Sequence, residues 1–357
     1  MNEKRLQKVI ANMKAEGLSQ IIVSATASLY YLTGVWLEPM ERLLALYISD
    51  KGDAVLFAND IFGLEPIDGL QIITHKDSDN PVQSIAKVVQ KGEIGIDKFW
   101  PSKFAIELME QRSDIRPKHG SSPVDKARML KDADEITAMR HASLVNDKVV
   151  EAAIAALKGG VSEIEIAELV EKLFAENGAN RYGEGQLVCF GAGGADPHHG
   201  PNETKLKAGD SVVLDIFKPI NRYWCDMTRT VFYKTATEEQ QKVYEVVKKA
   251  NLAAEAIIKP GLPMSSFDAV ARKVIADAGY GEYFTHRLGH GAGLECHEPP
   301  DNSAACEEIA QPGMVFSVEP GIYLPGKFGV RVEDLVLVTE TGCEVLNKAT
   351  KEFRILE

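Results

Sequence analysis

Short apolar runs alternate with amphipathic segments up to about residue 120 of the chain. The runs have strand length, whereas the segments between them carry apolar residues at helical spacing. This rhythm predicts an α/β domain around a central sheet, for which we expect a role in forming a lid, in dimerisation or in shaping substrate access. The predicted strands are 21–23, 43–48, 54–57 and 94–97, and the predicted helices are 2–16, 82–90 and 104–111.

A polar segment at residues 119–123, His-Gly-Ser-Ser-Pro, marks the predicted boundary between two domains, 1–123 and 124–357. A long helical region is predicted from 124 to about 157. The rest of the second domain mixes helices with β-branched apolar runs, which predicts an α+β domain containing hairpins. These runs are 211–217, 227–233, 314–318 and 329–338.

Two helix starts are marked by capping patterns in the second domain. Ser162 and Glu165 form the S-x-x-E capping box, which predicts the start of a helix. Ser265 with Asp268 gives a weaker cap signal for a helix that ends at Gly279.

The charge balance limits the class of partner. The 357 residues include 40 Lys and Arg against 52 Asp and Glu, which gives a net charge of −12. Because phosphate neutralisation supplies most nucleic-acid affinity, we do not expect DNA or RNA as the main partner. No run approaches the ~18 apolar residues of a membrane span, and the charged N-terminus is unlike a signal peptide. Five cysteines without a C-x-x-C pair indicate a reduced, cytoplasmic protein.

Four acidic residues interrupt apolar runs that otherwise read as strands. Asp215 lies in Val-Val-Leu-Asp-Ile-Phe, and Asp226 follows it across a Pro- and Asn-containing segment that suits a hairpin turn. Glu319 and Glu333 repeat the pattern on either side of a Pro- and Gly-rich connection. A surface acid on an edge strand is an open alternative for Asp215 alone. For the four together it is disfavoured, because buried carboxylates are costly unless they are paired or metal-bound.

A shared cation explains the four acids better than ion pairs do. Arg229 and Arg331 are the only positive charges within the strand runs, so ion pairs account for two acids at most. His290 lies between the two acidic pairs in a Gly-His-Gly segment, with His286 and His297 four and seven positions away. Four carboxylates and one imidazole without a thiolate suit Mn²⁺ or a similar ion better than structural zinc. The number of ligands suits two ions.

The ordered set Asp215, Asp226, His290, Glu319 and Glu333 resembles that of the pita-bread metallopeptidases, a family that includes methionine aminopeptidase, prolidase and aminopeptidase P. The motifs that carry the resemblance are LDI-x9-DMTRTV, GHGAGLECHEPP, MVFSVEPGIYLPG and GVRVEDLVLV. The resemblance covers 125–357, and more loosely the N-terminal part, which is similar to the creatinase/prolidase N-terminal domain. It implies an α/β N-terminal domain followed by an α+β pita-bread catalytic domain. Since methionine aminopeptidases usually lack the first domain, the proline-specific branch is favoured.

The resemblance implies two divalent ions per subunit, with Mn²⁺ preferred and Co²⁺ or Zn²⁺ as alternatives. Asp226 and Glu333 would bridge both ions, Asp215 would bind one ion, and His290 with Glu319 would bind the other. Other positions match the family's active site: His198, His286 and His297 for catalysis, and Tyr323 and Arg331 for substrate binding.

The implied reaction is hydrolysis of an Xaa-Pro peptide bond. Glu319 would accept the proton of the attacking water and relay it to the leaving proline nitrogen. His286 and His297 would donate hydrogen bonds to the carbonyl oxygen or tetrahedral intermediate. For Arg331, an ion pair with a ligand aspartate and contact with the substrate are equally open alternatives.

Two departures from the family bear on the substrate. Residues 216–218, Ile-Phe-Lys, are bulkier than the small residue that often follows the first aspartate. No Lys or Arg lies between His297 and Val318, where dipeptide-specific members commonly carry an arginine for the substrate carboxylate. The compact length favours the prolidase (Xaa-Pro dipeptidase) type, whereas the missing base favours aminopeptidase P activity on longer Xaa-Pro-Xaa peptides. We prefer the former.

Other classes of function are open at this point. One is a pita-bread fold used as a non-catalytic binding module, and another is metal-free hydrolysis of the creatinase kind. The complete ligand set disfavours both, because members with those functions tend to lose ligands. We expect proline-containing dipeptides or short peptides as partners, a homodimer as the assembly, and no membrane association.

Overall fold

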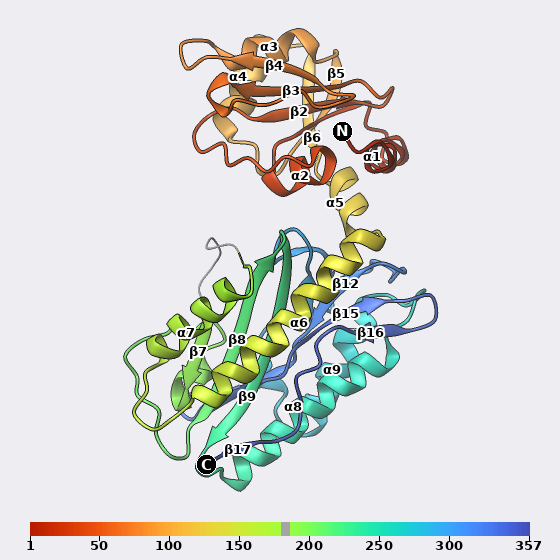
Figure 1. Cartoon of the computed structure of the whole chain (residues 1–357). Coiled ribbons are helices and arrows are strands. Elements are labelled where there is room, and N and C mark those ends of the chain that lie inside the picture. The colour runs from red at the N-terminus through yellow and green to blue at the C-terminus, as the bar shows by residue number, and fades with distance from the viewer. Residues whose placement is uncertain (180–185) are drawn as a thin grey trace. The chain divides into compact units, whose positions relative to one another are not determined.

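The computed structural model describes residues 1–179 and 186–357, which form two compact units, Met1–Arg128 and Met129–Glu357 (Figure 1). Each unit has its own sheet and its own apolar core. The division expected from the sequence at 123/124 falls inside helix α5 (Ser122–Met129).

The first unit is a mixed six-stranded sheet in the order β4-β3-β2-β1-β5-β6. All four predicted strands and all three predicted helices are present. Strands β4 and β6 were not predicted, because most of their side chains are exposed or half-buried and therefore leave no apolar run. The strands are β1 (Gln20–Val23), β2 (Ala45–Ser49), β3 (Ala54–Asn59), β4 (Gln71–His75), β5 (Gly92–Ile96) and β6 (Ile115–His119), and the helices are α1 (Glu3–Ala15), α2 (Thr26–Thr33), α3 (Pro81–Val88) and α4 (Ser102–Gln111).

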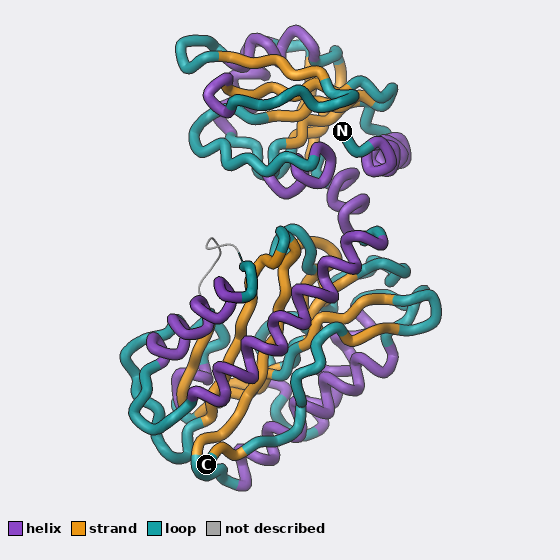
Figure 2. The backbone as a smooth tube through the Cα atoms, in the orientation of Figure 1, coloured by secondary structure: helices purple, strands orange, loops and turns teal. Residues whose placement is uncertain are grey.

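Four long helices pack against the sheets of the second unit (Figure 2). Figure 1 shows α6 lying along β8 and β9, and α6 and α7 share an apolar core with β7, β8 and β9. Helices α8 and α9 share a second core with the strands near the C-terminal end of the sequence. The helices are α6 (Ala133–Ala156), α7 (Glu163–Glu176), α8 (Glu238–Ile257) and α9 (Ser265–Asp277).

Two sequence expectations about these helices need correction. The helical region predicted from 124 to 157 is two helices, because Asp132 caps the start of α6 and forms a capping box with Glu135. The Ser162 box opens α7 as predicted. Helix α9 is confirmed but its cap is not, since no side chain caps it and the Asp268 carboxylate instead binds Arg272 and a backbone N–H.

The strands of the second unit form a four-stranded sheet in the order β17-β9-β8-β7, a five-stranded sheet in the order β11-β10-β12-β15-β16, and the hairpin β13-β14. This helix-and-sheet arrangement confirms an α+β catalytic domain after an α/β domain. The strands are β7 (Leu187–Phe190), β8 (Ser211–Ile220), β9 (Tyr223–Tyr233), β10 (Gly289–Gly291), β11 (Glu298–Asn302), β12 (Val315–Val318), β13 (Gly321–Leu324), β14 (Phe328–Arg331), β15 (Asp334–Val338), β16 (Cys343–Val345) and β17 (Ile355–Leu356).

The longest hairpin joins β8 and β9 through the two residues Asn221 and Arg222. Both have positive φ, 50° and 75°, as in the type I′ turn whose twist matches that of paired strands. The ladder then runs unbroken from Ile220↔Tyr223 to Ser211↔Phe232, so the register of every side chain on the two strands is fixed. The hairpin expected from the sequence is confirmed.

Among the described residues, none of the helices has both the length and the apolar character that crossing a bilayer requires.

Helix α8 offers a direct test of local stability through its N-cap. Thr237 accepts a hydrogen bond from the Gln240 N–H, and the Gln240 side chain accepts one from the Thr237 N–H. Thr237→Ala should lower the free energy of unfolding by about 1 kcal/mol, because an N–H of the first turn loses its acceptor. Thr237→Ser should stay near the wild-type value. Chemical denaturation followed by circular dichroism measures both, and equal values for the two variants would contradict the account.

Candidate active site

The β8–β9 hairpin places Asp215 and Asp226 on one face of the sheet. Asp215 pairs with Thr228, and Asp226 pairs with Phe217, so the two aspartates are diagonal neighbours on adjacent strands. Both are buried, at 8% and 4% exposure. The unbroken ladder therefore holds two carboxylates close together where an apolar strand would normally bury hydrophobic side chains.

Glu319 and Glu333 lie where two paired strands are interrupted. Strand β12 ends at Val318 and β13 begins at Gly321, while β14 ends at Arg331 and β15 begins at Asp334. Val318 pairs with Asp334 and Gly321 with Arg331, so the two interruptions face each other. The run predicted as one strand over 329–338 is therefore two strands with Glu333 at the break.

His290 lies on the short strand β10, between β11 and β12, and its backbone is tightly packed. Its N–H donates to Ser317 Oγ at 2.9 Å, and that hydroxyl donates to Glu319 Oε1 at 3.0 Å. A Cβ on the preceding Gly289 would lie 2.2 Å from the Ser317 carbonyl oxygen, so only glycine allows this approach. His290 Nδ1 lies 3.2 Å from the Gly291 carbonyl, and Nε2 faces Glu319 Oε1 at 3.3 Å and Asp226 Oδ2 at 3.7 Å.

These side chains meet in one cavity of about 510 Å³. All five predicted metal ligands line it, and so do three predicted catalytic histidines. Apolar Leu187 and Phe217 form part of the wall, as the bulky segment after Asp215 suggested. The predicted residues along the cavity are Asp215, Asp226, His290, Glu319 and Glu333, with His198, His286, His297 and Arg331.

The cavity carries a surplus of buried negative charge. Burial, reinforced by the neighbouring carboxylates, raises the pKa of Asp226 and Glu333 well above the usual range. Burial raises the pKa of Glu319 to about 7. Burial and the nearby His297 lower the pKa of His290 to about 3, so its imidazole is neutral and can donate a lone pair.

The side chains fit a divalent cation. Ligand atoms of Asp226, His290 and Glu333 all lie within 4.8 Å of one another. Asp215 Oδ1 is buried and has no hydrogen-bond partner among the described residues, which is unusual for a carboxylate oxygen. A cation would offset the carboxylate repulsion and supply a partner for this oxygen. Oxygen ligands with one imidazole are the set that Mn²⁺ and similar ions accept.

Arg331 forms an ion pair with a predicted ligand. Its guanidinium donates to Asp215 Oδ2 at 2.6 Å and to the Tyr323 hydroxyl at 2.9 Å. The ion-pair alternative for Arg331 is thus present in the structure, and its contact with substrate stays a prediction. Tyr323 reaches the cavity residues through these bonds and through His286, whose Nε2 lies 2.8 Å from the hydroxyl.

His286 is engaged at both ring nitrogens. Nδ1 lies 2.7 Å from the Arg287 carbonyl, which can only accept, so Nδ1 carries the hydrogen and Nε2 accepts from Tyr323. Burial, together with Arg331, lowers the pKa of His286 to about 4, so the neutral form dominates near neutral pH. In this arrangement His286 orients Tyr323, and a hydrogen bond from it to a substrate carbonyl would require these bonds to rearrange.

Two polar cavity residues were given no role in the site from the sequence. Arg287 lies in the cavity wall beside His286 and forms an ion pair with Asp301 at 2.5 Å. Cys296 also lines the cavity and donates its S–H to Asp226 Oδ2 at 3.5 Å, and burial raises the pKa of its thiol. The position of Arg287 directly after an active-site histidine was the available signal.

The comparisons with known proteins agree with this site. The pattern of metallopeptidase family M24 matches residues 137–340, and that of the creatinase/prolidase N-terminal domain matches residues 5–130. The chain therefore belongs to metallopeptidase family M24, and it is a hydrolase of a class that uses divalent metal. This confirms the resemblance inferred from the sequence motifs.

The similarity to individual proteins extends over the whole chain. An uncharacterized peptidase of Staphylococcus aureus (strain USA300) is 35% identical, over 97% of this chain and 99% of the relative. A recombinant prolidase from Thermococcus sibiricus is 35% identical in structure-based comparison, with a TM-score of 0.93 and full coverage of both chains. A dipeptidase from Pyrococcus horikoshii OT3 is 35% identical, with a TM-score of 0.91 over 99% of this chain and 100% of that one.

The low pKa of His286 gives a prediction for how the free energy of unfolding depends on pH. Because the pKa of His286 is about 4 in the folded protein, below the ordinary 6.5, the unfolded chain takes up a proton more readily between these pH values. The contribution of His286 to the free energy of unfolding is therefore fully present above pH 6.5 and is lost as pH falls toward 4. In chelator-treated protein, His286→Asn should remove about 1–3 kcal/mol of this pH dependence.

Denaturant unfolding at pH values from 7.5 to 4.5 measures the effect. The exposed His141 offers a control, since His141→Asn should keep the wild-type profile. A His286→Asn profile parallel to that of the wild type would contradict the assignment.

Proposed function

We propose that the chain is a dinuclear metal-dependent peptidase that cleaves Xaa-Pro bonds, of the prolidase (Xaa-Pro dipeptidase) type. The observation that carries the proposal is the convergence of four carboxylates and one imidazole on a single cavity in a chain of family M24. The creatinase/prolidase N-terminal domain and the similarity to a prolidase and a dipeptidase support the proline-specific branch. A homodimer and a cytoplasmic location stay predictions.

The proposed ligands divide between two ions as the sequence suggested. As the family resemblance implies, Asp226 and Glu333 would bridge, Asp215 would bind one ion through the unpaired Oδ1, and His290 with Glu319 would bind the other. Bound divalent cations would polarise the scissile carbonyl and make hydroxide available near neutral pH. Mn²⁺ is the preferred ion, with Co²⁺ and Zn²⁺ as alternatives.

The chain's own groups supply the proton transfers and positioning. Glu319 lies in the cavity and accepts a hydrogen bond from Ser317, so it is placed to take the proton of the attacking water and pass it to the proline nitrogen. His297 and His198 line the cavity and would donate hydrogen bonds to the carbonyl oxygen. Leu187 and Phe217 would pack against the proline ring and exclude water.

Arg287 supports dipeptides as the preferred substrates. The segment after His297 has no base for the substrate's terminal carboxylate, and Arg287, two residues before β10, brings a guanidinium into the cavity wall. Its ion pair with Asp301, which lies where a base would otherwise be expected, holds it there. Guanidinium is well suited to carboxylate recognition. The alternative, aminopeptidase P activity on longer peptides, needs no such cation.

Metal removal tests the proposed reaction. Chelated protein should be inactive on Ala-Pro and regain activity with Mn²⁺ or Co²⁺, and Asp226→Ala should lower kcat/KM at least about 10³-fold because a bridging ligand is lost. Activity is measured as released proline, and metal content is measured by elemental analysis. Unchanged activity in Asp226→Ala would overturn the mechanism. A folded wild-type chain that binds no metal after Mn²⁺ loading would instead favour the non-catalytic binding module.

Substrate length tests the role of Arg287. The Mn²⁺-loaded enzyme should cleave Ala-Pro faster than Ala-Pro-Ala. Arg287→Met should raise KM for Ala-Pro by roughly tenfold or more, because a charge-assisted contact worth about 1.5–3 kcal/mol is removed. Arg140→Met, which breaks the exposed ion pair with Glu344, is the matched control and should change neither substrate's KM. Faster cleavage of the tripeptide by the wild type would show the aminopeptidase P type instead.

A further inference from the structure

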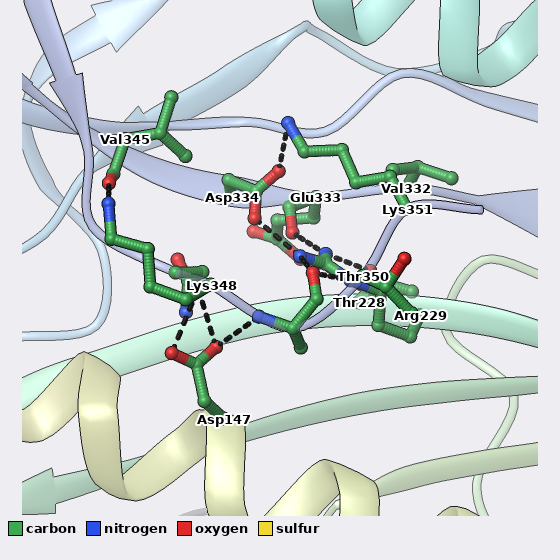
Figure 3. A network of polar contacts seen from close by, with 12 residues as sticks. Asp147, Thr228, Arg229, Val332, Glu333, Asp334, Val345, Lys348, Thr350 and Lys351 are labelled. Carbon is green, nitrogen blue, oxygen red and sulfur yellow. Dashed lines mark hydrogen bonds and ion pairs between the residues drawn. The ribbon is translucent and has the colours of Figure 1, made fainter.

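Lys351, 18 positions after the cavity residue Glu333, is the centre of a polar network beside the active site. Its ammonium group lies 2.6 Å from Asp334 Oδ2, and it donates to Asn251 Oδ1 at 2.7 Å. It also donates to both carboxylate oxygens of Glu255, at 2.7 and 2.8 Å. Figure 3 shows Lys351 and Arg229 both directed at Asp334. Asn251 and Asp334 are fully buried.

The contact with Asn251 fixes the direction of an amide that binds the main chain next to two predicted ligands. Because Oδ1 accepts from Lys351, the amide NH₂ must point the other way. It donates to the Val318 carbonyl at 2.9 Å and to the Val332 carbonyl at 3.4 Å. Val318 precedes Glu319 and Val332 precedes Glu333, so one amide ties together the main chain at both interruptions.

The contact with Asp334 secures the residue that follows Glu333. Asp334 Oδ1 accepts from Arg229 at 2.7 Å, and Arg229 also donates to the Glu333 carbonyl at 2.6 Å. The Glu333 N–H donates to the Thr228 carbonyl, and the Thr228 hydroxyl donates to Glu333 Oε2. Since 332–333 lie outside the strands, these bonds replace the ladder that holds Asp215 and Asp226 in place.

Charge balance makes Lys351 necessary to this network. Glu255 and Asp334 supply two carboxylates, and Lys351 and Arg229 supply two cations. Burial, with a contribution from Asp334, raises the pKa of Glu255 to about 7, and Lys351 opposes this rise. Without Lys351 the Glu255 and Asp334 carboxylates would repel each other, and Asp334 Oδ2 and Asn251 Oδ1 would each lose a contact.

We propose that Lys351 is a positioning residue that sets the spacing of Glu319 and Glu333, and through them the affinity of the site for its metal ions. The C-terminal segment of the chain is thus a structural part of the active site without touching substrate or metal. The inference rests on the proposed ligand role of the two glutamates.

The test compares Lys351→Met and Lys351→Arg with the wild type. Groups that hold metal ligands in place commonly change metal affinity by about 10–100-fold when removed. Lys351→Met should therefore weaken Mn²⁺ binding to the metal-free protein at least tenfold by calorimetry and alter the visible spectrum of the Co²⁺-loaded form. It should lower kcat more than it raises KM, and Lys351→Arg should restore most of the loss.

Arg354→Met is the matched control, because Arg354 belongs to the same C-terminal segment and donates from Nη1 to both carboxylate oxygens of Glu151 at 2.9 Å, not to Asn251 or Asp334. It should lower the melting temperature while leaving metal affinity within twofold of wild type. A folded Lys351→Met with wild-type affinity and Co²⁺ spectrum, or an effect equal to that of Arg354→Met, would overturn the inference.

Two further outcomes are distinguishable. If Lys351→Met does not fold, the milder Lys351→Gln is measured by the same criteria, and wild-type affinity in that variant would overturn the inference. If the wild-type chain binds no Mn²⁺, the proposed function fails, and this inference fails with it. Metal binding that is normal in the wild type and in the Lys351 variants overturns the positioning role alone.

Discussion

Repulsion among four carboxylates confined to one cavity is the constraint on which this structure depends. Two adjacent strands and two facing strand interruptions bring Asp215, Asp226, Glu319 and Glu333 to one cavity, and burial pushes the pKa of three of them upward. A protein holds such groups together only with strong compensating bonds or a cation. The Arg331 ion pair compensates one of the four, and the remaining negative charge makes the cavity a site for divalent metal.

The two halves of the cavity are held by different means. The aspartates lie on an unbroken ladder, so backbone hydrogen bonds fix their positions. The glutamates lie at interruptions, where the side chains of Asn251 from α8 and Arg229 from β9 bind the main chain. The Thr228 hydroxyl donates to Glu333 Oε2, and Lys351 from the C-terminal segment acts through Asn251 and Asp334. The interruptions let both glutamates turn into the cavity. They also make the geometry of these two ligands depend on distant residues.

The parts of this arrangement that could be predicted from the sequence are those that depend on short sequence patterns. The acids at 215 and 226 in apolar runs, with turn residues between them, predicted the hairpin, and the Ser162 box predicted the start of α7. Strands β4 and β6 escaped prediction because exposed strands show no apolar run. Arg287 and Lys351 could not be assigned, since their partners are fixed by tertiary contacts; Lys351 and Asn251 are 100 positions apart.

The central claim is that the cavity carboxylates and His290 hold two divalent cations. Anomalous scattering at the manganese edge from crystals of the Mn²⁺-loaded protein tests it most directly. We expect two adjacent peaks in the cavity, with Asp226 and Glu333 oxygens shared between them and His290 Nε2 bound to one. A single peak would contradict the dinuclear assignment, and the absence of any peak in the cavity, in protein that is folded and loaded, would contradict the metal site itself.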